Sequence, residues 1–202
     1  MPKMSQSKVV SGVLRATTVL VVSVGAYFIG WGAEAKYEDL IPSNTPAPEV
    51  KLLEQGRYDE AVQTVLDRRM ERKEGLPDAH DYSEVAWIYL ERAKKDLASR
   101  EKWARQAASY LDKAATSAPK DPFILESAMD GFNRVGDYSE KGCPHYEKAV
   151  GFGEAALALV QGSTVTVEGH VRSYPTQPIK EGIEPRIKRI RGKVEAWCKK
   201  KS

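Results

Sequence analysis

The residue types most often used for catalysis and metal binding are few and scattered in this chain. The cysteines are Cys143 and Cys198, and the histidines are His80, His145 and His170. Cys143 and His145 could supply two metal ligands, but no second C-x-x-C or H-x₃-H pair accompanies them, as a zinc site would require. There is also no glycine-rich phosphate loop, no nucleophile elbow and no carboxylate pair at a catalytic spacing. We therefore expect no metal, no cofactor and no catalytic site, and hence a protein that is not an enzyme.

The composition narrows the class of protein further. The chain has 202 residues, of which 42% are hydrophobic and 29% are charged. These proportions suit one domain with an appendage, and they exclude a disulfide-dense scaffold, a collagen, a fully disordered chain and a polytopic membrane protein. The formal net charge of +3 is too small to indicate a nucleic-acid partner, and we expect none.

One segment has the length and the character of a membrane span. Residues 16–33 are 18 consecutive uncharged and mostly apolar positions. As a helix they would measure about 27 Å, against a hydrocarbon core of about 30 Å. An uncleaved anchor is favoured by the long preceding stretch and by Tyr27 and Trp31 near one interface. A cleaved signal peptide is favoured by the Ala33-Glu34-Ala35 pattern, and cleavage near Ala35 would release the body into the periplasm.

The charges on either side of this segment predict its orientation. Residues 1–15 carry Lys3, Lys8 and Arg15, whereas acidic residues follow the segment within 34–48. Because positive charge stays on the cytoplasmic side, we expect a cytoplasmic N-terminus, a single pass through the inner or cell membrane, and an extracytoplasmic body, which is periplasmic in a Gram-negative cell. The stretch 34–48 is rich in proline and is expected to be an extended linker.

The expected location of the body outside the cytoplasm suggests that the two cysteines form a disulfide. Disulfides persist outside the cytoplasm, and we therefore predict a bond between Cys143 and Cys198. Such a bond would close a loop of about 55 residues and stabilise the fold by roughly 4 kcal/mol on the chain-entropy model. The alternative is two free, half-buried thiols.

Helical periodicity runs from residue 49 to residue 161. Two short helices are interrupted at Gly56-Arg57-Tyr58, and apolar stripes predict helices near 80–97, 100–117 and 144–161. A further helix is expected to end at Gly136-Asp137-Tyr138, because glycine accepts the left-handed conformation that ends helices. The predicted fold class is all-α, an antiparallel helix-hairpin solenoid in which small residues let the helices approach: Ala61, Ala86, Ala107, Ala114 and Ala128.

Two local patterns suggest an internal repeat. Gly56-Arg57-Tyr58-Asp59-Glu60 is similar to Gly136-Asp137-Tyr138-Ser139-Glu140. The run 111–119, with Ala114 and Pro119, looks like the end of a tetratricopeptide repeat. Residues 49–161 thus resemble three degenerate tetratricopeptide repeats, although the first lacks its closing proline and the spacing exceeds the usual value of about 34 residues. Another stack of helical hairpins would give the same pattern.

The resemblance implies a groove lined by the first helix of each pair, and therefore a peptide or protein partner. The positions beside the core stripes of these helices are the candidate groove residues, namely Trp87, Leu90, Glu91, Lys94, Phe123, Glu126, Asp130, Asn133 and Arg134. Trp87 and Leu90 could equally pack against the neighbouring repeat, because inner helices bury two faces.

The last forty residues differ from the repeats. Residues 162–182 are expected to be irregular or extended, because β-branched residues alternate there. Residues 183–202 predict a basic amphipathic helix that caps the last repeat, and residues 180–202 carry nine positive and three negative side chains. A second interpretation is that its basic surface contacts anionic lipid or another polyanion through Arg186, Lys188, Arg189 and Arg191.

Together these features predict a mode of action. We expect a membrane-tethered, non-catalytic scaffold that presents a groove to a protein or peptide partner in a cell-envelope assembly. The alternative is an accessory protein that contacts anionic lipid or a polyanion through its basic C-terminal helix.

Overall fold

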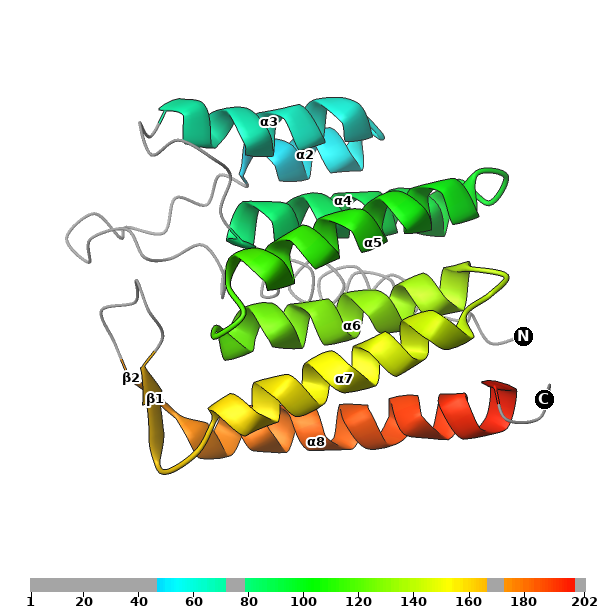
Figure 1. Ribbon diagram of the computed structural model, residues 1–202. Coiled ribbons are helices and arrows are strands. Elements are labelled where there is room, and N and C mark those ends of the chain that lie inside the picture. Colours follow the sequence, from blue (N-terminus) through cyan, green and yellow to red (C-terminus); the bar gives the residue numbers. More distant parts are fainter. Residues whose placement is uncertain (1–46, 72–78, 167–172, 199–202) are drawn as a thin grey trace, which may run out of the picture. The chain divides into compact units, whose positions relative to one another are not determined.

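In the computed structural model, the described residues are 47–71, 79–166 and 173–198, and they are mostly helical (Figure 1). The expected N-terminus 1–15, the membrane segment 16–33 and nearly all of the linker 34–48 lie outside these residues. Within the described ranges, no helix combines the length and the apolar character that a membrane crossing needs.

The first hairpin is built from α2 (Pro48–Glu54) and α3 (Tyr58–Glu71). Pro48 begins α2, where its missing N–H costs no helical hydrogen bond. Gly56 has a φ of +73° in the turn between the two helices, a conformation that a side chain would strain. The interruption predicted at Gly56-Arg57-Tyr58 is therefore confirmed.

The second hairpin consists of α4 (Ala79–Lys95) and α5 (Arg100–Ser117). The side chain of Asp96 organises its turn by accepting hydrogen bonds from the Ser99 N–H, at 3.1 Å, and from Trp103 Nε1, at 2.9 Å. These contacts stabilise the short connection, and they account for the close agreement with the helices predicted near 80–97 and 100–117.

The third hairpin consists of α6 (Pro122–Tyr138) and α7 (Cys143–Leu159). Asp121 caps α6, because its carboxylate accepts the N–H groups of Phe123 and Ile124. The predicted end of this helix at Gly136 is wrong, since α6 continues through Tyr138. A Cβ at Gly136 would overlap the ring of Tyr146, so this glycine permits close packing and does not end the helix.

A short antiparallel ribbon follows, in which β1 (Thr164–Thr166) pairs with β2 (Ser173–Pro175) and Val165 lies opposite Tyr174. The final helix, α8 (Thr176–Lys193), continues into a π-helical turn, η2 (Val194–Cys198). It begins earlier than the predicted position 183. Pro178 lies in its first turn, where proline is tolerated.

Neighbouring helices pack side by side along the body, and α6 also contacts α4 (Figure 1). The continuous core lies between these layers, and its largest fully buried side chains include Phe132, Leu111, Ile183 and Ile190. The small residues predicted at helix contacts are confirmed, because all five of those alanines are almost completely buried. This packing fixes the positions of α4, α6 and α8 relative to one another.

Candidate functional site: the α4–α6–α8 surface

The contact between α4 and α6 brings several predicted groove residues together. Trp87 Nε1 donates to Ser127 Oγ at 3.0 Å, and Ser83 Oγ lies 2.7 Å from the same oxygen. The guanidinium of Arg134 lies over the Trp87 ring, 4.6 Å from its centroid, and a nitrogen of Arg134 is 3.4 Å from a carboxylate oxygen of Glu91. Trp87, Glu91 and Arg134 therefore form one half-buried cluster with fixed geometry.

Two neighbours of this cluster differ in their accessibility. The ammonium of Lys94 is 4.0 Å from Glu91, and 61% of its side chain is exposed. Leu90, in contrast, is completely buried and belongs to the main core with Ala86 and Leu111. The prediction of Leu90 as a groove residue is therefore wrong, because its helical phase turns it toward α5 and the core.

The contact between α6 and α8 uses the other predicted groove residues. Arg186 on α8 forms ion pairs with both Glu126 and Asp130 on α6. Lys193 Nζ lies 2.8 Å from Asn133 Oδ1 and 2.6 Å from Asp137 Oδ1. These polar groups of α6 are thus engaged by the C-terminal helix of the same chain.

The environment of Asp130 shows how strongly this contact is shielded from water. Burial raises the pKa of Asp130, and the positive charge of Arg186 opposes that effect. About a fifth of each side chain in the Arg186–Asp130 pair remains exposed. Removing Arg186 would therefore leave a shielded carboxylate without its cation, which is more costly than breaking an exposed ion pair.

Phe123 is the last predicted groove residue, and it lies near the ribbon. Its ring contacts the Tyr174 ring edge to face, with 4.9 Å between the centroids. This position at the start of α6 is therefore partly covered by β2.

The four basic residues predicted to form one surface have different environments. Arg186 is directed toward α6, and Arg191 pairs with Glu154 on α7. Lys188 and Arg189 are exposed. The basic surface is thus divided, and half of its charge is used in contacts within the chain.

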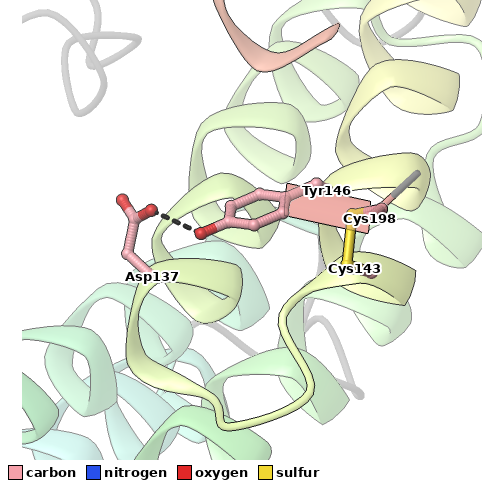
Figure 2. Close-up of a disulfide and its surroundings, with 4 residues drawn as sticks. All are labelled: Asp137, Cys143, Tyr146 and Cys198. Atoms are coloured by element: carbon pink, nitrogen blue, oxygen red, sulfur yellow. Dashed lines mark hydrogen bonds between the residues drawn. A yellow bond between two sulfur atoms is a disulfide. The ribbon is translucent and has the colours of Figure 1, made fainter. Parts of the chain in front are cut away.

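The end of α8 is fixed to α7 by a disulfide between Cys143 and Cys198, whose Cα atoms are 5.6 Å apart (Figure 2). This is the pairing that the sequence analysis predicted. Figure 2 also shows Tyr146 beside the disulfide, with its hydroxyl donating to Asp137 at 2.8 Å. Burial and this acidic acceptor raise the pKa of the Tyr146 hydroxyl. Because Lys193 donates to the same carboxylate, α6, α7 and α8 are tied together at this end.

Some residues of this surface were missed by sequence reasoning. Ser83, Ser127, Asp137 and Lys193 complete the contacts between the helices. Of these four residues, only Lys193 could have been identified from the sequence. It lies seven positions after Arg186 and therefore on the same face of the helix.

Comparison with known proteins adds no family assignment, because no family model, curated protein or solved structure matches this chain. In the ranges 47–71, 79–166 and 173–198, no three or more His, Cys, Asp or Glu side chains are grouped so as to hold a metal ion. The surface is characterised by its geometry, in which contacts between α4, α6 and α8 hold polar and aromatic side chains in place.

Proposed function

We propose that the chain is a non-catalytic interaction scaffold with a tetratricopeptide-repeat-like body. The observation that carries this proposal is the cluster of Trp87, Glu91 and Arg134 on the packed helices α4 and α6. Aromatic and arginine side chains that are held in place before binding are the residue types that dominate protein interfaces. Their order reduces the entropy lost on association.

The contacts within the chain support one part of the surface as the region that binds a partner. Glu126, Asp130 and Asn133 already bind cations of α8. Lys94 and Arg134 keep large exposed fractions, 61% and 40%. We therefore place partner binding on the α4–α6 part of the surface.

We further propose that the body is tethered to the inner or cell membrane through residues 16–33 and lies outside the cytoplasm, in a cell-envelope assembly. The disulfide supports this location, since such bonds persist in oxidising compartments. N-terminal sequencing of the mature protein distinguishes a retained anchor from cleavage near Ala35.

Site-specific photocrosslinking in the native membrane tests the scaffold proposal. A photoreactive amino acid at position 94 or 134 is expected to capture the same partner protein. Position 105 on α5 is the matched control, because Arg105 is also a highly exposed cation. The proposal fails if position 105 captures that partner equally well, or if positions 94 and 134 capture no protein.

A second candidate function is contact with anionic lipid or a polyanion through the exposed residues Lys188 and Arg189. Because Arg186 and Arg191 pair within the chain, this contact would be weaker than the sequence alone suggests. Binding to phosphatidylglycerol vesicles that falls with salt, and is lost in the Lys188→Gln/Arg189→Gln variant, would favour this function over the scaffold.

A further inference from the structure

Three helices at the start of the body direct charged side chains toward one another. Arg68 on α3 places one guanidinium nitrogen 2.6 Å from Glu49 on α2, and another 3.4 Å from Glu84 on α4. Asp81, one turn before Glu84 on α4, acts electrostatically on both Arg68 and Glu84. One arginine is thus surrounded by three carboxyl groups from two other helices.

This cluster is shielded from water. Glu49 is 3% exposed and Asp81 is 5% exposed, and the Glu84 side chain is 20% exposed. Placing several negative charges in such an environment is unfavourable unless each is compensated. His80, at the start of α4, lies 3.7 Å from Asp121. We therefore expect that one of the three carboxyl groups, the one that is most easily protonated, is neutral near physiological pH.

The cluster lies where the α2–α3 hairpin joins the rest of the body. Apolar contacts of Val62 and Val65 with Val85 and Ile88 form a small core of their own at this junction. The charged cluster thus acts beside this apolar cluster, and beside the ion pair between Asp59 on α3 and Arg92 on α4, in holding the hairpin on α4.

We propose that Glu84 is a pH-sensitive latch for the α2–α3 hairpin. In its neutral form, Glu84 lies beside the Glu49 carboxylate without repulsion, and Arg68 neutralises Glu49. Loss of the Glu84 proton adds a negative charge that faces Glu49 on α2 and Asp81 on α4, with Arg68 on α3 as the cation that opposes it. The hairpin is then held less firmly on α4.

The pKa of Glu84 gives the pH range of this effect. The pKa of Glu84 is raised to about 7. Burial is the main cause, the positive charge of Arg68 opposes it, and the charges of Glu49 and Asp81 and a hydrogen bond to Glu49 add to the increase. Because the docked pKa is above the ordinary value of about 4.5, docking is strongest in acid and weakens as the pH rises through 7. One proton is involved, so the docking constant changes by at most about tenfold per pH unit.

Amide hydrogen exchange in the full chain in detergent tests this latch, with protection factors corrected for the intrinsic rate at each pH. Between pH 5.5 and 8 the protection of α2–α3 is expected to fall on the order of tenfold, while that of α5 to α7 stays constant. Glu84→Gln is expected to keep high protection at both pH values. Glu54→Gln, an exposed acid on α2, is the matched control and should behave like the wild type.

Two results would overturn the proposal. One is a wild-type protection profile for α2–α3 that does not change with pH, and the other is a Glu84→Gln variant that loses protection as the wild type does. If Glu84→Gln does not fold, Glu49→Gln replaces it. Removing the Glu49 charge should then shift the midpoint of the transition to lower pH, and an unchanged midpoint would count against the latch.

Discussion

The bond between Cys143 and Cys198 gives the most quantitative expectation about stability. The two residues are separated by 55 positions, and a loop of this size stabilises the native state by about 4 kcal/mol on the chain-entropy model. For a body of this length, each kcal/mol corresponds to about 2–4 °C in the melting temperature. The Cys143→Ser/Cys198→Ser variant is therefore expected to unfold about 10 °C below the oxidised wild type.

The native contacts of α8 indicate where the loss of the bond acts. Ile183, Ile187 and Ile190 remain buried in the main core, and Arg186 still pairs with α6. We therefore expect α8 to stay folded in the variant, with fraying confined to the last turn. Loss of the disulfide should lower the unfolding free energy mainly through the unfolded chain.

Urea and thermal unfolding followed by far-ultraviolet circular dichroism measure this effect. The wild type should lose the same stability when a reductant is added, and the double serine variant, which serves as the control, should not respond to the reductant. A difference below about 1 kcal/mol between the oxidised wild type and the variant would refute the chain-entropy estimate. A wild type that is indifferent to reductant would show that the bond is not formed in solution.

Two paired substitutions test the packing of α8. Gly153→Ala places a Cβ 2.6 Å from Ile187 and is expected to lower the unfolding free energy by about 1–3 kcal/mol. In contrast, the Cβ of Gly151→Ala on the same helix meets no neighbour, and this variant should stabilise the protein by up to about 1 kcal/mol. Urea unfolding measures both changes, and changes of the same sign would contradict the packing of α7 against α8. Arg186→Met leaves two acids on α6 without their cation and should cost roughly 2–3 kcal/mol, since the pair is only partly exposed. Lys188→Met, at an exposed position, should change the unfolding free energy by less than about 0.5 kcal/mol, so similar losses in the two variants would refute the assigned role of Arg186.

The helices could be predicted from the sequence because their signals are local. The apolar stripe of α5 and the prolines that follow it give its bounds, and the glycine turn after α2 has a backbone conformation that few other residues adopt. The same reasoning gave the wrong end for α6 at Gly136. This glycine allows close packing against Tyr146, and the sequence alone does not distinguish such a glycine from one that ends a helix. The early start of α8 was missed for a related reason, since Pro178 begins a helix as readily as it ends one.

The candidate surface was predictable only in part, because helical phase does not reveal which helix lies opposite a side chain. Trp87 and Leu90 are three positions apart and both flank the core stripe of α4. Leu90 is buried in the main core, while Trp87 contacts Ser127, which lies forty positions later in the sequence. Distinguishing them requires the distance between helices, which no local pattern encodes.

The arrangement of α8 also explains why charge counting overestimates the basic surface. Ile187 of α8 lies close to Gly153 of α7, and Arg186 and Lys193 of α8 pair with acids of α6. The helix turns exposed polar side chains outward, including Glu184 and Lys188. A further hairpin would have to bury these charged groups, which is unfavourable. We therefore infer that one face of α8 joins it to the body through Arg186 and Lys193, that its opposite face disfavours the packing of a further hairpin, and that part of the basic charge is used in the internal contact.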